Sequence, residues 1–169
     1  MNTTNEIISG KIFIYPTDTV YGIGCDATNQ DSVKKIKEIK GRDKDKPLSI
    51  IAPSLKWINE NLIVDVDLSK YLPGPYTLIL KKKDPEFLKH IAPGDSLGIR
   101  IPKTELTNEI QKSRRPFVTT SLNLSGNPPI TSIDKIPNEI KNKVDHIIDG
   151  GELNGRPSTL IINGKEIKR

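Results

Sequence analysis

The stretch SVKKIKEIKGRDKDKPLSII (residues 32–51) joins a helical pattern to an apolar strand through a turn rich in cations. One face of the predicted helix is apolar and consists of Val33, Ile36 and Ile39. Asp31 or Ser32 can cap its start, and Gly41 is typical of a helix end. Residues 48–51 follow as a buried strand. A helix that leads into a buried strand is a unit of α/β folds.

The same alternation of helical patterns and strand-length apolar runs continues along the chain. We predict helices at 2–9, 54–61 and 104–112, and mixed helix and turn at 132–141. We predict further strands at 12–15, 77–80, 97–101, 117–120, 146–148 and 159–162. Residues 15–24 are expected to form a polar loop between strands. Several connections are too short for a purely parallel sheet, so the predicted fold class is α/β with a mixed sheet flanked by helices.

Length and composition favour one compact domain over residues 1–169, since the chain is 34% hydrophobic and 28% charged. Its net charge of +5 permits an anionic partner such as nucleic acid without requiring one. Residues 1–10 lack the apolar core of a signal peptide, and no later apolar run is long enough to span a bilayer. We therefore expect a cytoplasmic protein that has no membrane partner.

Cysteine and histidine are scarce, which limits the chemistry that the chain can perform. Cys25 is the sole cysteine and excludes an internal disulfide. With only His90 and His146 beside it, the sequence contains no cluster with zinc-ligand spacing. The same scarcity argues against a Cys-His or Ser-His-Asp nucleophile, although either histidine could meet a serine in space.

Two polar segments, far apart in sequence, are the main candidates for a phosphate site. The first contains Lys40, Arg42 and Lys46, and the second is SLNLSG at residues 121–126. Cations and small polar groups suit a polyanion such as a nucleoside triphosphate. Cations at a helix end can also simply complement the helix dipole, but three of them around one short turn favour the phosphate site.

Known nucleotide-binding motifs do not account for such a site. The Walker pattern GxxxxGK[ST] is absent from the sequence. Residues 22–27 formally match the dinucleotide fingerprint, but no helical pattern opens on those glycines, so the match is accidental. Any nucleotide must be held by a different architecture.

Six polar residues are candidate binding residues, each with an ordinary alternative. Arg100 ends an apolar strand, where it is either exposed at a sheet edge or held for an anionic ligand, of which we favour a carboxylate. Thr17 and Thr19 offer hydroxyl groups for a zwitterion, unless they only form a turn. Ser158 likewise offers a hydroxyl group for a ligand, unless it only belongs to a turn. Ser121 and Asn123 follow a strand at its carboxyl end, where open α/β sheets bind ligands, although a turn rich in Ser, Asn and Gly is the more common explanation for such a string.

Six motifs in order along the chain make the sequence resemble the YrdC-type threonylcarbamoyl-AMP synthases, in a short, single-domain form. They are YPTDTVYG (15–22), KGR with KPL (40–42 and 46–48), PGPYT (73–77), GIRIP (98–102), SLNLSG (121–126) and PST (157–159). The resemblance implies a twisted α/β sheet with an open, positively charged concave face. It also implies that L-threonine, bicarbonate or carbon dioxide, and ATP react to give threonylcarbamoyl-AMP and pyrophosphate. Threonylcarbamoyl-AMP is the implied precursor of the threonylcarbamoyladenosine (t6A) modification in tRNA.

The resemblance also assigns roles to residues at matching positions. The implied catalytic residues are Lys40, Arg42, Ser121 and Asn123. The implied ATP-binding residues are Lys40, Arg42, Lys46, Ser96, Asn123 and Thr131. The implied threonine-binding residues are Thr17, Thr19, Arg100, Ser121 and Ser158. No enzyme nucleophile and no protein ligand to a metal are implied, because Mg²⁺ is held mainly by ATP. The implied partners are ATP, L-threonine and bicarbonate, together with tRNA or a downstream tRNA threonylcarbamoyl-transfer complex.

Two residues depart from the family pattern near these positions. Asp43 stands where the family usually has proline, so an acid lies beside the proposed phosphate site and can weaken it or pair with Lys44 or Lys46. Leu122 replaces the common alanine and is expected to narrow the nucleotide pocket.

Two other functions fit the sequence. One is a binding module for double-stranded RNA or tRNA, which would show steep salt dependence and no turnover. The other is a carbamoyl-transfer enzyme with a different acceptor. Replacing threonine with other amines in the assay would distinguish this enzyme from a threonylcarbamoyl-AMP synthase.

Overall fold

The computed structural model describes residues 2–41, 43, 45–123 and 126–168. Its strands are β1 (Phe13–Pro16), β2 (Tyr21–Gly24), β3 (Ser49–Ile51), β4 (Leu62–Ile63), β5 (Tyr76–Lys82), β6 (Ser96–Arg100), β7 (Phe117–Ser121), β8 (His146–Ile147), β9 (Thr159–Ile162) and β10 (Lys165–Ile167). Its α-helices are α1 (Thr3–Ile8), α2 (Gln30–Lys40), α3 (Leu55–Asn61), α4 (Glu105–Ser113) and α5 (Asn138–Lys141). Short 3₁₀ turns occupy Leu68–Lys70 and Ile133–Lys135.

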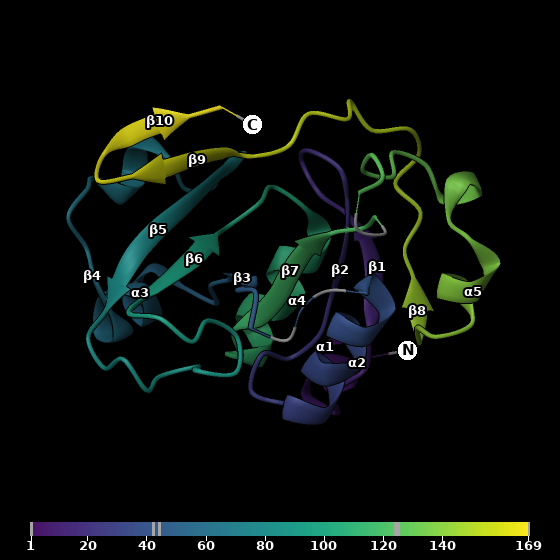
Figure 1. Ribbon diagram of the computed structural model, residues 1–169, viewed down its shortest axis with the longest axis horizontal. Coiled ribbons are helices and arrows are strands. Elements are labelled where there is room, and N and C mark those ends of the chain that lie inside the picture. The colour runs from purple at the N-terminus through teal and green to yellow at the C-terminus, as the bar shows by residue number, and fades with distance from the viewer. Residues whose placement is uncertain (1, 42, 44, 124–125, 169) are drawn as a thin grey trace.

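Within the described residues, all ten strands join one twisted sheet in the order β10-β9-β5-β6-β3-β7-β2-β1-β8, with β4 beside β5 (Figure 1). The pairs β3–β6, β5–β9 and β1–β8 are parallel, and the other pairs are antiparallel. The predicted α/β class and the mixed sheet are thereby confirmed. The open, basic concave face stays a prediction. None of the described helices is long and apolar enough to cross a membrane.

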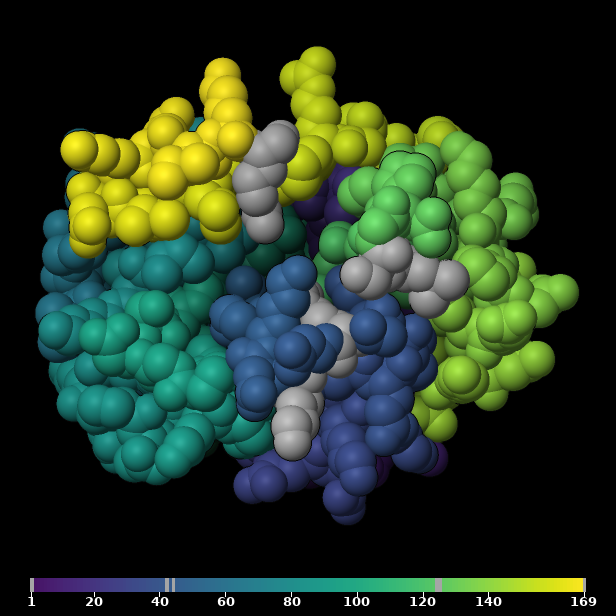
Figure 2. All heavy atoms as spheres, viewed as in Figure 1, coloured from purple at the N-terminus to yellow at the C-terminus, as the bar shows by residue number. Residues whose placement is uncertain are grey.

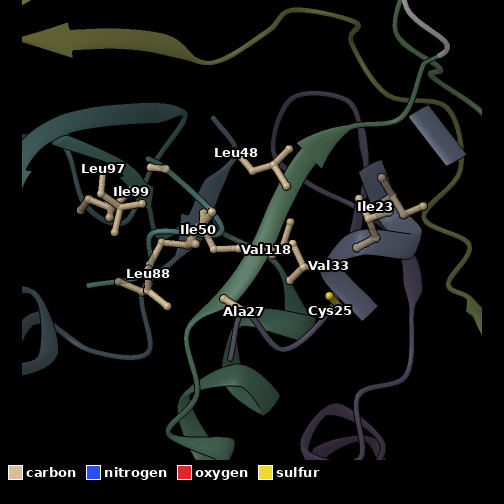
Figure 3. Close-up of a cluster of buried hydrophobic side chains, with 14 of the residues drawn as sticks. Ile23, Cys25, Ala27, Val33, Leu48, Ile50, Leu88, Leu97, Ile99 and Val118 are labelled. Carbon is tan, nitrogen blue, oxygen red and sulfur yellow. The ribbon is translucent and has the colours of Figure 1, made fainter. Parts of the chain in front are cut away.

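The sheet separates two apolar cores because neighbouring residues of a strand point to opposite faces. The larger core includes Ile14, Ile50 and Val118, and the apolar face of α2 packs into it (Figure 3). The smaller core includes their neighbours Tyr15, Ile51 and Phe117, with Ile7 of α1 and two residues of α4. Both faces of the central strands are therefore buried, which fixes their register and the positions of their ends.

Strand β2 was not predicted, because residues 15–24 were expected to form a loop. In the structure β2 lies between β1 and β7, near the middle of the sheet. Gly24 of this strand serves close packing, since an added Cβ would lie 1.9 Å from the carbonyl oxygen of Val118. The fingerprint match at 22–27 starts inside this strand, in agreement with its accidental character.

The other differences concern helix caps and edge strands. Asn29, rather than Asp31 or Ser32, caps α2 by accepting from the Ser32 amide at 3.0 Å. Gly41 ends the helix in the left-handed conformation at φ 61°, as predicted. Strands β4 and β10 were not predicted, since two or three residues carry too little periodicity to be recognised.

We expect Gly24→Ala to lower the free energy of unfolding by about 3 kcal/mol, because the added methyl group must displace the backbone of β7. Urea unfolding followed by circular dichroism measures this change. Gly94→Ala is the matched control, since a Cβ there would meet no atom within 4 Å. The control should stay within about 0.5 kcal/mol of the parent. Equal stability of the two variants would contradict the role given to Gly24.

Candidate active site

A cavity of about 180 Å³ opens where the β1–β2 turn, the ends of β6 and β7, and the segment before β9 meet. Figure 2 shows the surface hollowed between the yellow C-terminal segment and the blue segment that follows α2. More than half of the lining residues carry hydroxyl groups, among them Thr17, Thr19, Thr77, Ser121 and Ser158. Arg100 is the one lining residue with a charged side chain among those that the structure describes. The cavity is suited to a small anionic or zwitterionic ligand.

Thr17 and Thr19 form a turn and a cavity wall at the same time. The Thr17 hydroxyl donates to the Val20 carbonyl oxygen at 2.6 Å and accepts from the Thr19 and Val20 amides at 3.1 and 3.2 Å. The Thr19 hydroxyl lies 2.9 Å from the Thr17 hydroxyl, and either oxygen can be the donor of that hydrogen bond. In both cases the Thr19 oxygen keeps a lone pair with which it can accept a hydrogen bond from a ligand. The turn and binding alternatives for this loop are therefore compatible.

Arg100 is the last residue of β6, and only 7% of its surface is exposed. Its Nη2 atom donates to Oδ1 of Asp18, which lies between the two threonines. Burial lowers the pKa of Arg100, and the nearby Asp18 carboxylate opposes that shift. Its Nε–H group is buried and has no hydrogen-bond partner among the described residues. Arg100 is thus buried and paired with Asp18, not exposed at an edge, and it lines the cavity.

Ser158 lines the cavity from the segment before β9, where it is only 4% exposed. Its hydroxyl lies 2.8 Å from the hydroxyl of Thr77 on β5. The parallel pairing of β5 with β9 brings these two residues together, since Tyr76 is the register partner of Thr159. Sequence reasoning missed Thr77 and Asp18 as site residues, although both lie within motifs that it recognised.

Lys40, the last residue of α2, is buried with 7% of its surface exposed. Its ammonium group donates to the Thr120 hydroxyl and to the Ser121 carbonyl oxygen, both at 2.7 Å. These two partners line the cavity at the end of β7. The structure therefore brings the two polar segments together, and Lys40 is more than a surface cation at a helix end. Arg42 lies outside the described residues.

Ser121 and Asn123 are connected to each other by hydrogen bonds. The Ser121 hydroxyl donates to Oδ1 of Asn123 at 2.8 Å, and Nδ2 of Asn123 donates to the Asn127 carbonyl oxygen at 2.9 Å. Asn123 is not a lining residue of the cavity, whereas Ser121 is. Leu122 between them is 1% exposed, packs in the larger core and does not line this cavity. Its expected narrowing of the nucleotide pocket stays a prediction.

Three weaker candidates for ATP binding lie away from the cavity wall. Lys46 is exposed, next to the lining residue Pro47. Ser96 begins β6 and so lies at the opposite end of that strand from Arg100. Thr131 donates to Glu152 at 3.0 Å. Asp43, which was expected to weaken the phosphate site or to pair with Lys44 or Lys46, accepts from the Asp45 amide at 3.0 Å. Lys44 lies outside the described residues.

Comparisons with known proteins identify the family. The family model for Sua5, YciO and YrdC proteins, described as telomere recombination, matches residues 5–168. A Methanocaldococcus jannaschii protein, provisionally named a threonylcarbamoyl-AMP synthase, is 42% identical over 161 residues, which are 92% of this chain and 76% of the relative. The threonylcarbamoyl-AMP synthase of Pseudoalteromonas atlantica is 29% identical over 94% of this chain and 89% of its own length.

A solved structure supports the same assignment. The crystal structure of Pyrococcus abyssi Sua5 complexed with L-threonine matches with a TM-score of 0.79 and 34% identity. The match covers 94% of this chain but 49% of the Sua5 chain, so the protein spans about half the length of that relative. Because the family model matches nearly the whole chain and the fold matches a solved member, the chain belongs to the Sua5/YciO/YrdC family.

Proposed function

We propose that the protein is a threonylcarbamoyl-AMP synthase, which converts L-threonine, bicarbonate or carbon dioxide, and ATP into threonylcarbamoyl-AMP and pyrophosphate for t6A modification of tRNA. The single observation that carries this proposal is the buried Arg100, the one charged residue among the described residues that line a hydroxyl-rich cavity, with Lys40 bonded to two of the other lining residues. The names of the relatives support the same activity.

The cavity suits the amino acid better than the nucleotide. Its volume of about 180 Å³ is below the roughly 300 Å³ at which pockets for larger ligands begin. A threonine carboxylate at Arg100 would complete the hydrogen bonding of the buried guanidinium. Thr17, Thr19, Ser121 and Ser158 would surround the rest of the molecule. Most of ATP would then lie outside the cavity, across its mouth.

The phosphates are proposed to lie on the side of Lys40. This ammonium group is already fixed at the end of β7, so it needs no reorganisation as charge develops on the phosphate. Ser121 and Asn123 would position the phosphates with it, and Arg42, Lys46, Ser96 and Thr131 are proposed as further contacts to ATP. The threonine amine captures the one-carbon unit as a carbamate, which attacks the α-phosphate while pyrophosphate leaves. Positioning and charge stabilisation then suffice for catalysis.

Mg²⁺ is proposed to enter with ATP. Among the described residues no three His, Cys, Asp or Glu side chains gather as a metal site. Asp18, the carboxylate next to the cavity, is already paired with Arg100. This donor set fits a cation held by phosphate and water oxygens, as Mg²⁺ is in many nucleotide enzymes. The cation would supply charge neutralisation of the pyrophosphate.

We also propose that the product passes to a tRNA threonylcarbamoyl-transfer complex in the cytoplasm. A mixed anhydride of a carbamate and a phosphate hydrolyses in water, so its transfer to tRNA must follow its synthesis closely. This step belongs to another enzyme, because the proposed reaction ends with the free adenylate.

The proposed reaction is tested by pyrophosphate release from MgATP, with L-threonine and bicarbonate omitted in turn. We expect release only when both are present. Release without either substrate would indicate a different nucleotide enzyme. No release, together with tight and salt-sensitive RNA binding, would favour an RNA-binding module.

Arg100→Ala should raise the KM for threonine by about 10- to 100-fold, the scale of one lost hydrogen bond to a charged group. The KM for ATP should change much less. Steady-state pyrophosphate release with each substrate varied measures both constants. Arg115→Ala is the matched control, since Arg115 pairs with Asp26 at 3.4 Å and does not line the cavity. An unchanged threonine KM in Arg100→Ala would reject the carboxylate role.

Lys40→Ala should lower kcat by about 100-fold or more, because a fixed donor at the developing phosphate charge is lost. Saturating pyrophosphate-release assays measure the effect. Lys35→Ala, an exposed change on the same helix, should keep the activity of the parent. A Lys40→Ala variant as active as the parent would remove Lys40 from the catalytic residues.

A further inference from the structure

We propose that Asp18 is a positioning residue of this active site: its carboxylate holds the Arg100 guanidinium in place for the α-carboxylate of the substrate. Asp18 thereby sets the preference for amino acids with a free carboxylate. The inference rests on the proposed function, because it concerns the threonine side of the same site. It assigns no direct contact between Asp18 and the substrate.

Both oxygens of the Asp18 carboxylate are used to join segments that are distant in sequence. Oδ1 accepts from Nη2 of Arg100, and Oδ2 accepts from the backbone amide of Lys103 at 3.1 Å. A second bond nearby, from the Thr104 hydroxyl to the Pro16 carbonyl oxygen at 3.1 Å, links the same two segments. The β1–β2 turn is thus fixed to the chain that follows β6. The carboxylate cannot turn toward a ligand without losing one of its two partners.

The position of Asp18 along the turn separates it from the substrate. Its neighbours Thr17 and Thr19 line the cavity, and Arg100 lines it as well, but Asp18 does not. The side chains of Asp18 and Arg100 are 15% and 8% exposed. Asp18 therefore acts behind the cavity wall, through the arginine.

This arrangement prepares Arg100 for an anion. Burial disfavours the guanidinium charge, and Asp18 offsets this effect from one side of the group. Asp18 holds the Nη2 atom, the Nε–H donor has no partner among the described residues, and the Arg100 residue lines the cavity. A planar group that is already fixed loses less conformational freedom when it binds a carboxylate. Without Asp18 the guanidinium could turn away from its binding position.

The test compares the parent with Asp18→Asn, which has nearly the same shape but no charge. Calorimetry measures the Kd of L-threonine, and pyrophosphate release measures the KM values of threonine and ATP. We expect the threonine constants to rise about 10- to 100-fold, the scale for groups that orient a binding residue. The KM for ATP should stay within about twofold. The preference for L-threonine over L-threoninamide, which lacks the carboxylate, should fall with the loss of threonine affinity.

Asp26→Asn is the matched control for loss of a buried carboxylate. Asp26 is 2% exposed, pairs with Arg115 at 3.4 Å and accepts from the Thr28 amide at 2.8 Å. It lies opposite Phe117 at the start of β7, whereas the cavity lies at the Ser121 end. Asp26→Asn should therefore lower stability but leave the Kd of threonine and the amide selectivity at the parental values.

A double-mutant cycle tests whether Asp18 acts through Arg100. In the Arg100→Ala background, Asp18→Asn should change the threonine constants by less than about twofold, because the group that it positions is absent. Asp18→Glu decides the question if Asp18→Asn does not fold, since the retained charge with a longer side chain should displace Arg100 and weaken threonine binding several-fold.

The outcomes separate this inference from the proposed function. A parent protein that neither binds threonine nor needs it for pyrophosphate release rejects the proposed function, and the role of Asp18 with it. A parent that needs threonine, together with Asp18 variants that retain its Kd and its amide selectivity, rejects only the role of Asp18. The role of Asp18 would also be rejected if the effects of Asp18→Asn and Arg100→Ala on the threonine constants were fully additive.

Discussion

A guanidinium group buried inside an α/β fold must be neutralised, and this constraint organises the functional end of the sheet. Arg100 ends β6 with 7% of its surface exposed, and Asp18 reaches it from the β1–β2 turn. The pair joins two segments that are 82 residues apart in sequence. Because the carboxylate also holds the chain after β6, the turn that carries Thr17 and Thr19 has a fixed place at the cavity. The hydroxyl groups of the wall are therefore ordered before any ligand arrives.

The two cores on either side of the sheet make this arrangement possible. Strands β3 and β7 are buried on both faces, so they cannot slide without exposing apolar side chains to water. Their fixed register places Ser121 opposite Gly22 at the cavity end of β7. Lys40 then connects α2 to this end through Thr120 and the Ser121 backbone. The helix that packs on the larger core thus places its last residue, Lys40, at the cavity end of β7.

Much of the fold could be predicted because periodicity reports burial directly. The apolar face of α2 and the runs of β3 and β7 follow patterns of 3.6 and 2 residues, and they were found close to their observed bounds. Strand β2 could not be recognised from the sequence because glycine normally weakens a strand. In the structure Gly24 permits close contact between two backbones. The helix cap was misplaced by a few residues, since Asn29, Asp31 and Ser32 are all good capping residues and only the fold selects one.

The residues that form the site were partly determined by the sequence. Its motifs supplied the cations and hydroxyl groups, and the resemblance pointed to Thr17, Thr19, Arg100, Ser121 and Ser158, which the structure gathers around one cavity. The tertiary structure alone decided which groups are buried and which partners they have. Asp18 and Thr77 became site residues only through pairings across distant segments, because hydrogen bonds depend on positions in space that spacing along the chain does not fix. The sequence thus determined the chemistry that was available, and the packing of the sheet determined how that chemistry is arranged.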